Sequence, residues 1–568
     1  MPSKATWQMS SFSSRGTPPE QSVRAACTVV LLRDGAAGLE VLLLLRAAGA
    51  RFLGGFHVFP GGAIVPEDRD ASAMQRVVGL QDAAASARLG IPSGGVSFWL
   101  AAVRETFEEC GILLAVDESR GVLEPDRLAT VRPDRAAVNA GTMSFVDLLR
   151  AHRLVVPAQD LVYFDHWLTP PTRTRRFDTR FFMARAPQGQ PASHDGAETV
   201  DARWVRPDEA LAEAGRGAIE IANATSTTLK MLAQRSSVEE ALAAARSLAE
   251  IEANRPCIAQ GSAGPRTFYP HDPAYHEIHW CDPSESMQTT YDLVPGVAKP
   301  LDRWAARLIA PNRGPMTGPG TNSYFVGERE LAVIDPGPLD EDHLAALMAY
   351  GDGRIRWILC THAHRDHSPA AARLAAATGA QVIGMPAPSG LGHDPTFAPD
   401  RIIGDGEVMQ LGEVSLSAIH TPGHASNHLC FHLRSTGMLF TGDHVMQGST
   451  VVIAPPDGSM RLYLRSLERL LALDIAIIAP GHGYLIGAAH REVRRLIRHR
   501  LWREARVLAA VERKGPASVD ELLDDVYPDL TPALRGAASH SLHAHLLKLV
   551  EDGAASEEAG RYAAAAGR

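Results

Sequence analysis

Residues 361–367 have the sequence Thr-His-Ala-His-Arg-Asp-His, which places three imidazoles and one carboxylate within a single short segment. The segment follows the apolar run 357–360, which has the length and composition of a buried strand. On a turn at the end of a strand, these four side chains can converge on one point. Histidine and aspartate suit Zn²⁺ and, to a lesser degree, Fe or Mn. The sequence therefore predicts a metal site at this turn.

Three further candidate ligands follow later apolar runs. They lie in the motifs HTPGH, TGDH and PGHG, after the runs 414–419, 438–440 and 475–479. If these runs are strands of one sheet, all the ligands line its carboxyl edge. Seven ligands are too many for one tetrahedral ion, so they favour two ions with one bridging carboxylate. The predicted ligands are His362, His364, Asp366, His367, His424, Asp443 and His482.

Together these segments resemble the metallo-β-lactamase superfamily over roughly residues 300–490. The resemblance implies an αββα sandwich. It also implies that His362, His364 and His424 hold one metal, that Asp366, His367 and His482 hold the second, and that Asp443 bridges them. Asp366 is the predicted catalytic residue of this site. Asp335, in the motif VIDPG, resembles the family's structural aspartate. A structural role is favoured for His343, His393, His428 and His444, and support of the metal ligands is the alternative for the last two.

The stretch 314–327, GPMTGPGTNSYFVG, resembles one branch of the superfamily, which carries a short C-terminal winged helix. Residues 515–556 hold two helical segments and then Asp552-Gly553, an order that suits a winged helix. A small helical cap is the alternative. The basic segment 491–514 could contact nucleic-acid phosphates, but a solvated helix face is the favoured interpretation.

A second site is predicted on a helix that begins near Phe98. Glu105, Glu108 and Glu109 occupy positions i, i+3 and i+4, so they share one face. Three clustered carboxylates repel one another unless a cation lies among them. Mg²⁺ or Mn²⁺ fits, with a substrate diphosphate completing its coordination. These glutamates are the predicted metal ligands and catalytic residues, and any of the three could be the general base.

Residues 104–112 resemble the second half of the Nudix box. The spacing of Gly61 and Glu67, with five residues between them, resembles the first half. An insertion over 68–103 separates the halves, and Thr106 departs from the usual hydrophobic residue. Three further features are similar to a Nudix subgroup of coenzyme A diphosphatases. They are the stretch 166–182, Glu198 and the stretch 204–211. The resemblance implies an α/β/α sandwich. A domain that binds its ligand without cleaving it is the alternative.

The chain has 568 residues, enough for about three to five domains. The predicted fold class is multidomain, α/β and α+β. We expect a disordered tail over 1–22, a Nudix-like domain over 23–254, a linker over 255–300, a metallo-β-lactamase-fold domain over 301–492 and a small winged-helix-like domain over 493–568.

Charge and composition limit the expected binding partners and the expected cellular compartment of the protein. A net charge of −9 and a pI near 6.2 do not favour nucleic acid or an anionic membrane as a partner of the whole chain. No apolar run approaches the ~20 residues of a membrane helix. The six cysteines are scattered and form no CxxC pair, as expected of free thiols in a reducing cytosol. We therefore predict a cytoplasmic protein without a membrane partner.

The sequence predicts a bifunctional hydrolase of small molecules. The first site, with two Zn (or Fe or Mn) ions, would cleave an ester, thioester or phosphodiester. The Nudix site, with Mg or Mn, would cleave coenzyme A or a nucleoside-diphosphate derivative. One alternative is a metal-dependent endoribonuclease that binds RNA through its winged helix. The other is a binding protein that senses a nucleotide-like metabolite. The sequence assigns no substrate-binding residues.

Overall fold

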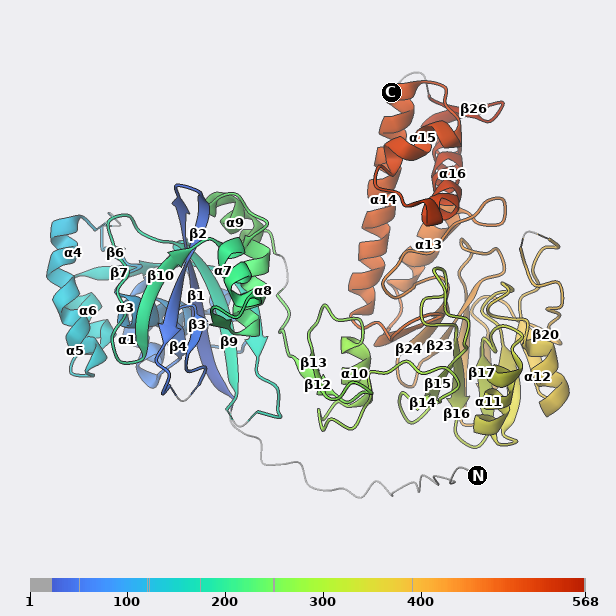
Figure 1. Cartoon of the computed structure of the whole chain (residues 1–568), viewed down its shortest axis with the longest axis horizontal. Helices are drawn as coiled ribbons and strands as arrows, with labels where there is room; N and C mark the ends of the chain where they lie inside the picture. The colour runs from blue at the N-terminus through green and yellow to red at the C-terminus, as the bar shows by residue number, and fades with distance from the viewer. Residues whose placement is uncertain are drawn as a thin grey trace. The chain divides into compact units, whose positions relative to one another are not determined.

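The computed structural model describes residues 23–565, except 51, 120, 122, 174, 249–250 and 391. The predicted disordered tail over 1–22 lies outside the described residues. The chain divides into two compact units, Met1–Pro256 and Cys257–Arg568 (Figure 1). Each unit has its own hydrophobic cores and is described separately.

The first unit is built on a twisted mixed sheet. Its central strands β1 and β9 are parallel, and Val29 lies opposite Phe182. Strand β10 (Thr199–Val205) pairs with β2, and β4 (Gly61–Ala63) pairs with β1. The path of the sheet is β11 (Glu220–Ile221), β3 (Phe56–Val58), β2 (Gly38–Arg46), β1 (Arg24–Gly35), β9 (Phe177–Arg185) and β8 (Val162–Leu168).

Helices cover both faces of this sheet, which gives the expected α/β/α sandwich. Helix α3 (Val96–Cys110) packs on one face, where Trp99 meets Phe182 edge to face with ring centroids 4.8 Å apart. The opposite face is covered by α7 (Pro207–Gly215), α8 (Asn223–Leu232) and α9 (Val238–Arg246). Because α3 is buried along most of its length, its glutamates are held on a rigid element.

The insertion inside the Nudix box folds against α3. Besides the start of α3, residues 68–103 contain the second half of a short 3₁₀ turn (Pro66–Arg69), α1 (Ala71–Met74), β5 (Val77–Val78) and α2 (Asp82–Leu89). Strand β5 joins β7 (Leu154–Pro157) and β6 (Val116–Asp117) in a small second sheet. The helices α4 (Pro125–Val131), α5 (Arg135–Asn139) and α6 (Phe145–Ala151) complete this side of the unit.

The second unit contains two sheets packed face to face. One sheet follows the order β14 (Lys299–Pro300), β15 (Ala305–Ile309), β16 (Asn322–Gly327), β17 (Leu331–Ile334), β18 (Ile355–Leu359), β19 (Gln381–Gly384) and β20 (Arg401–Ile402). The other follows β21 (Val408–Leu411), β22 (Val414–His420), β23 (Leu429–Leu433), β24 (Met438–Gly442) and β25 (Ile477–Pro480).

One core lies between the two sheets, and helices cover their outer faces. The inner core joins Tyr324 on β16 to Phe440 on β24, with ring centroids 5.1 Å apart. Outside the first sheet pack α11 (Glu341–Gly351) and α12 (Ala371–Thr378), and outside the second pack α13 (Met460–Leu470) and the start of α14 (Ala489–Lys514). This is the αββα sandwich that the resemblance implies.

The segment expected to be a linker is a folded part of the second unit. Residues 257–300 contain the hairpin β12 (Cys257–Ala259) and β13 (Arg266–Phe268), helix α10 (Tyr275–Cys281) and β14. The physical reason is Glu277, which is fully buried and bonded to Arg307 and to the backbone N–H of Leu485. The Pro- and Gly-rich composition of the segment conceals this anchor.

The C-terminal residues form the expected winged helix. Their core joins the end of α14 to α15 (Val519–Val526), α16 (Arg535–Glu551) and the hairpin β26 (Ala555–Glu558) and β27 (Arg561–Ala564). The hairpin follows the predicted turn at Asp552-Gly553. Helix α14 spans both cores, since Leu496 belongs to the sandwich and Val511 to the winged helix.

Candidate metal centre

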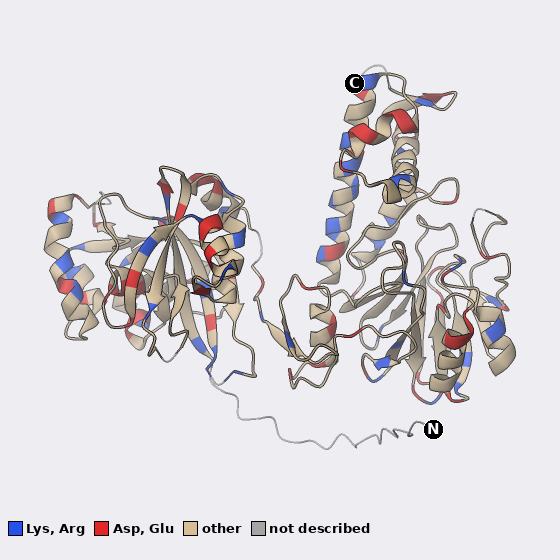
Figure 2. Ribbon diagram, viewed as in Figure 1, with Lys and Arg blue, Asp and Glu red and all other residues tan. Residues whose placement is uncertain are grey.

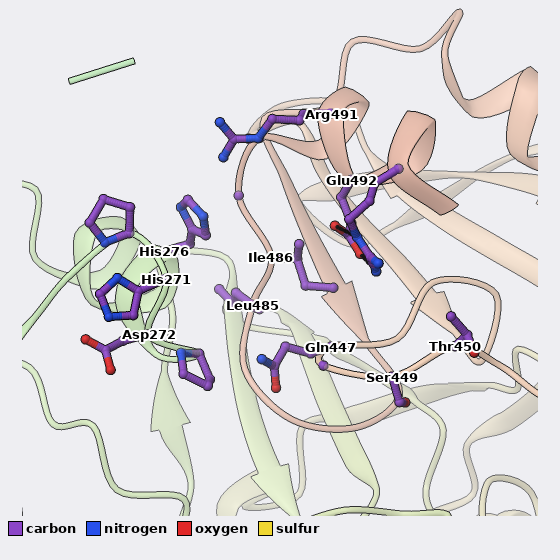
Figure 3. A pocket seen from close by; sticks show the side chains of 16 residues that line it. His271, Asp272, His276, Gln447, Ser449, Thr450, Leu485, Ile486, Arg491 and Glu492 are labelled. Carbon is purple, nitrogen blue, oxygen red and sulfur yellow. Dashed lines mark hydrogen bonds and ion pairs between the residues drawn. The ribbon is translucent and has the colours of Figure 1, made fainter. Parts of the chain in front are cut away.

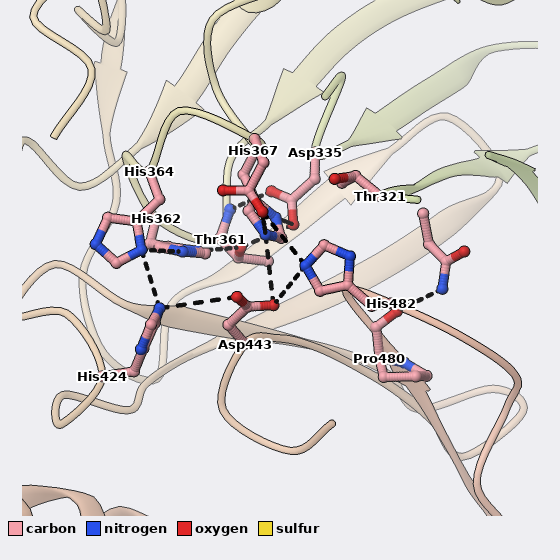
Figure 4. A network of polar contacts seen from close by, with 12 residues as sticks. Thr321, Asp335, Thr361, His362, His364, His367, His424, Asp443, Pro480 and His482 are labelled. Carbon is pink, nitrogen blue, oxygen red and sulfur yellow. Dashed lines mark hydrogen bonds and ion pairs between the residues drawn. The ribbon is translucent and has the colours of Figure 1, made fainter. Parts of the chain in front are cut away.

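All seven predicted ligands of the second unit lie on loops that follow strands. The loop after β18 carries four of them, and the loops after β22, β24 and β25 carry one each. Strand β18 belongs to one sheet and the other three belong to the second, so both sheets contribute to one site. Figure 4 shows the convergence of His362, His364, His367, His424, Asp443 and His482.

Three imidazoles form the first cluster. His362 Nε2 lies 3.0 Å from His364 Nδ1, and His364 Nδ1 lies 2.9 Å from His424 Nε2. All three nitrogens lie within 4.8 Å of one another. Three nitrogen donors with this spacing can hold one Zn²⁺ and leave a fourth position open.

Two histidines and two aspartates form the second cluster. His482 Nε2 lies 3.4 Å from Asp366 Oδ2 and 3.3 Å from Asp443 Oδ1. His367 Nε2 lies 3.5 Å and 3.4 Å from the same two oxygens. Three of these atoms are buried without a hydrogen-bond partner within the described residues, namely His367 Nε2, His482 Nε2 and Asp443 Oδ1. A divalent cation at their centre would satisfy all of them, so the donor set fits a metal.

Asp443 connects the two clusters. Its Oδ1 faces the second cluster, and its Oδ2 lies 3.8 Å from His424 Nε2 of the first. A carboxylate with one oxygen toward each cluster has the geometry of a bridging ligand. The arrangement therefore fits two cations that share Asp443.

The outer nitrogens of the histidines are held by hydrogen bonds, which fixes the ring orientations. Thr361 Oγ1 lies 2.9 Å from His362 Nδ1, and the Val452 carbonyl lies 2.8 Å from His424 Nδ1. His482 Nδ1 lies 3.2 Å from the Gly320 carbonyl. In each of these histidines the other nitrogen, Nε2, therefore faces the cluster.

Asp335 fixes the remaining imidazole and the strand end that carries the motif. Its Oδ2 lies 2.8 Å from His367 Nδ1 and accepts a hydrogen bond from Thr361 Oγ1, also at 2.8 Å. Its Oδ1 accepts a hydrogen bond from the Thr361 backbone N–H. Asp335 thus orients His367 without facing the metal cluster itself.

The two clusters differ in their electrostatics. Burial lowers the pKa of His362 and, together with neighbouring His424, lowers that of His364 to about 3. Burial acts in the same direction on the second cluster, but the carboxylates of Asp366 and Asp443 outweigh it. They raise the pKa of His367 and bring that of His482 to about 9. The first cluster thus offers neutral nitrogen ligands, and the carboxylates of the second attract positive charge.

Further histidines pack around the ligands. The His393 ring stacks on His364 with centroids 5.3 Å apart, and its Nε2 lies 3.1 Å from Asp457 Oδ2. The His428 ring lies 5.0 Å from His362, and His444 lies behind His428 at 5.8 Å. His343 contacts Ser323 Oγ from α11. His393, expected to be structural, thus touches a predicted ligand directly, a contact that its distance along the chain conceals.

In the first unit, α3 places the three glutamates on one face but does not gather them around a point. Glu105 Oε1 and Glu108 Oε2 each lie 2.9 Å from Arg104 Nη1. Glu109 Oε2 instead accepts a hydrogen bond from the Gly61 N–H at 2.9 Å. Across the described residues, the tight clusters of potential metal ligands are the two in the second unit. Burial raises the pKa of Glu109 and raises that of Glu105 to about 7.

The first half of the Nudix box is shifted by one residue from the expected register. Glu67 is exposed, whereas Asp68 is buried and pairs with Arg104 through two contacts of 3.0 and 2.9 Å. Both neighbouring glycines are tightly enclosed, because a Cβ on Gly61 would lie 2.3 Å from the Cys27 carbonyl oxygen and a Cβ on Gly62 would lie 2.5 Å from the Glu105 carboxylate. The Gly61-Gly62 doublet allowed both registers, and only the contact with Arg104 distinguishes them.

Three regions of the chain match known families. Residues 316–482 match the metallo-beta-lactamase superfamily, and residues 518–562 match the beta-lactamase associated winged helix domain. Residues 72–228 match the NUDT19 Nudix domain.

Curated relatives match a little under half of the chain. The lactamase-like protein aptB of Emericella nidulans is 29% identical over 286 residues, which cover 48% of this chain and 89% of the relative. An atrochrysone carboxyl ACP thioesterase of Aspergillus chevalieri is 32% identical over 270 residues, covering 44% of this chain and 80% of the relative. The chain belongs to the metallo-beta-lactamase superfamily. A solved Nudix hydrolase of Alicyclobacillus acidocaldarius is 31% identical, with a TM-score of 0.32, and covers 39% of this chain and 97% of its own.

This member of the metallo-beta-lactamase superfamily is thus a metal-dependent hydrolase with an additional Nudix domain and a C-terminal winged helix. Both families generally bind divalent metals, and the two ligand clusters of the second unit agree with that property for the metallo-beta-lactamase domain. None of the helices in the described part of the chain combines the length and apolar composition that a membrane crossing requires.

Proposed function

We propose that the metallo-beta-lactamase domain hydrolyses a thioester, with two divalent cations held by the seven predicted ligands. The observation that carries this proposal is the pair of clusters joined by Asp443. The choice of a thioester is supported by the names of the relatives, which include an ACP thioesterase and the thioesterase pkgB. Zn is the favoured metal, and Fe or Mn suits the same ligands.

Cations bound in this centre would polarise the scissile carbonyl and lower the pKa of an attacking water molecule. Asp366 is the candidate proton acceptor, because its side chain is 28% exposed while that of His367 is fully buried. The contacts of Thr361 Oγ1 with His362 Nδ1 and of the Asp335 carboxylate with His367 Nδ1 hold these imidazoles in place, so the site is preorganised.

The reaction balances with water as the only co-substrate. The water oxygen forms a bond to the carbonyl carbon, and the carbon–sulfur bond breaks. One water proton passes to Asp366 and from there to the departing sulfur. The products are a carboxylic acid, which ionises at neutral pH, and a thiol.

The test is hydrolysis of a substrate panel by the full chain, loaded with Zn, Fe or Mn. The panel holds an acyl thioester, the matching oxygen ester, a phosphodiester and single-stranded RNA. We expect thioester cleavage, and a loss of at least ~10³-fold in kcat/KM for Asp366→Asn, about 4 kcal/mol at the transition state. Asp352→Asn, at an exposed residue at the end of α11, is the matched control. RNA cleavage without thioester cleavage would contradict the proposal and favour the endoribonuclease alternative.

For the Nudix domain we propose hydrolysis of a diphosphate bond in coenzyme A or a nucleoside-diphosphate derivative. The observation that favours it is the shared α3 face of Glu105, Glu108 and Glu109, with Arg104 between two of the carboxylates. Mg²⁺ or Mn²⁺ bound with the substrate diphosphate would offset the charge of the phosphates and polarise the bond that breaks. Arg104 orients Glu105 and Glu108 beforehand, and Asp68 holds Arg104.

Coenzyme A and ADP-ribose are the substrates that test this second activity. With Mg²⁺ or Mn²⁺ we expect diphosphate cleavage that Glu108→Gln abolishes and Glu209→Gln, at an exposed position on α7, does not. Tight binding of either compound without turnover would instead support the sensing alternative.

A further inference from the structure

A buried histidine–aspartate pair lies beside the first ligand cluster, and neither residue is a predicted ligand. His393 belongs to the segment between β19 and β20, and Asp457 to the segment between β24 and α13. His393 Nε2 lies 3.1 Å from Asp457 Oδ2, and the two side chains are only 3% and 8% exposed. Because a carboxylate oxygen only accepts hydrogen bonds, His393 donates the proton of this contact. Acidic residues are scattered over helices and loops of both units (Figure 2), but a carboxylate as buried as Asp457 requires such a partner.

His393 is fixed to the loop that carries four of the predicted ligands. Its ring stacks on that of His364, with centroids 5.3 Å apart and 21° between the planes, and the backbones of the two residues form an isolated antiparallel bridge. The neighbouring Asp394 adds two hydrogen bonds to the same loop. Its N–H donates to the Ala363 carbonyl at 2.7 Å, and its Oδ2 accepts from Ser368 Oγ at 2.8 Å. These contacts set the position of the His393 ring relative to His364.

His364 differs from the other four histidine ligands in how its ring is held. In those four, the nitrogen that faces away from the cluster contacts Thr361, Asp335 or a backbone carbonyl. In His364 it is Nδ1 that faces the cluster, and Nε2 has no hydrogen-bond partner among the described residues. The stacked ring of His393 therefore takes the place of that hydrogen bond in orienting the imidazole.

Asp457 is fixed to the loop that carries His424. The same Oδ2 that contacts the histidine accepts a hydrogen bond from the Ser426 N–H at 2.9 Å. Shortly after Asp457, the Ser459 N–H donates to the Gly423 carbonyl at 2.8 Å. This end of the segment is thus bonded to the chain on both sides of His424.

The segment that carries Asp457 borders open space along part of its length. Residues 447–450 line a pocket of about 440 Å³, which Figure 3 shows from close by. A stretch of chain beside a pocket lacks packing on that side, so contacts elsewhere must fix its position. Asp457 lies further along the same segment, outside the pocket lining, and provides such a contact.

Together these contacts join the loops of two ligands that come from different sheets. His364 follows β18 of the first sheet, and His424 follows β22 of the second. Their facing nitrogens lie 2.9 Å apart, a spacing that depends on how the two loops are held relative to each other. The contact between His393 and Asp457 crosses from one loop to the other, so it links them outside the cluster itself.

We propose that His393 and Asp457 act as a positioning pair, which holds His364 and His424 in the geometry that the first cation requires. The proposal rests on the two-metal centre of the proposed function and is independent of the substrate that the centre cleaves. The stacking contact of the pair is with a ligand of the first cluster. Loss of the pair should therefore weaken the first cation selectively.

The experiment measures the Zn²⁺ affinity of the metal-free full chain by competition with a chromophoric chelator. Two parent variants separate the cations, because His482→Ala keeps the first cluster and His362→Ala keeps the second. Adding His393→Ala to the first parent should weaken Zn²⁺ binding ~10–100-fold, because the His364 ring loses its support. Adding it to the second parent should leave the Zn²⁺ affinity unchanged.

Variants of the second member of the pair separate positioning from a general loss of structure. Asp457→Ala should act like His393→Ala. Asp457→Asn should keep most of the affinity, because its amide oxygen can accept the same two hydrogen bonds. The matched control is His432→Ala, which removes a buried histidine of β23 outside both clusters and should leave the affinity of both parents unchanged.

A further variant decides the question if His393→Ala does not fold. His393→Phe keeps a ring in place but cannot bond to Asp457, so it should weaken the first cation ~10-fold. An affinity equal to that of the parent would contradict the role of the pair.

The outcomes distinguish this proposal from the proposed function. Equal affinity with and without His393→Ala in the His482→Ala parent would overturn the pair and leave the two-metal centre intact. Equal weakening in both parents would also overturn it, because a general loss of structure does not select between the clusters. If the His482→Ala parent binds no ion, the two-metal centre fails and the pair fails with it. None of these readouts depends on thioester cleavage.

Discussion

Glu277 offers a sharp test of whether residues 257–300 belong to the hydrolase unit. Its side chain is fully buried between Arg307 and Lys299, and Arg307 is itself almost fully buried. Glu277→Gln keeps the volume but removes the negative charge. Both cations then lose their counter-charge, and a broken buried pair typically costs about 3–5 kcal/mol.

The pKa of Glu277 leads to a similar magnitude. Burial alone would raise it, but Arg307 and Lys299 outweigh burial and lower it from 4.5 to about 2. A lowering of this size corresponds to about 3 kcal/mol of folding free energy. At about 2 °C per kcal/mol for a unit of this size, Glu277→Gln should lower the melting temperature of the second unit by roughly 6–10 °C.

Differential scanning calorimetry of the full chain measures this shift. Glu328→Gln is the control, because Glu328 pairs with Arg303 at the exposed surface and its loss should cost under about 0.5 kcal/mol. If Glu277→Gln melts like the control, the buried ion pairs do not hold the segment, and the account of residues 257–300 as an anchored part of the second unit is refuted.

Three other perturbations give definite expectations. The stabilisation from Glu277 should be fully present above about pH 4.5 and should disappear as the pH falls toward about 2, because the pKa of Glu277 is depressed in the folded state. Melting temperatures of the wild type and of Glu277→Gln, measured over this acid range, test the expectation. Asp68→Asn should destabilise the first unit by about 3 kcal/mol, because it leaves Arg104 buried without its main partner; urea unfolding should show no comparable loss for Glu67→Gln, at the exposed neighbour. Asp335→Asn should weaken metal retention ~10–100-fold through the loss of support for His367, as measured by competition with a chelator; retention equal to wild type would contradict that role.

The metal centre could be predicted from the sequence because its chemistry lies in short motifs. His362, His364, Asp366 and His367 lie close together on one loop, and the structure brings them together with His424, Asp443 and His482. Each ligand follows an apolar run that forms a strand, so the pattern of apolar runs and the short motifs indicated the same loops. Whether all seven bind metal stays a prediction.

The features that the sequence concealed depend on contacts between distant residues. Glu277 is an unremarkable acid in a Pro- and Gly-rich stretch until Arg307 and Leu485 are brought to it. The choice between Glu67 and Asp68 depends on which one reaches Arg104, and no local pattern decides it. His393 stacks on His364 from a loop 29 positions later. Burial and pairing of polar groups were therefore the least predictable part of the site.

The central claim is that the second unit holds two cations that share Asp443. Elemental analysis of Zn, Fe and Mn in the purified chain, after chelation and reloading, tests it most directly, with His482→Ala as the comparison. We predict about two ions per wild-type chain and about one in His482→Ala, where the first cluster stays intact. One ion or none in the wild type, or an unchanged count in His482→Ala, would contradict it.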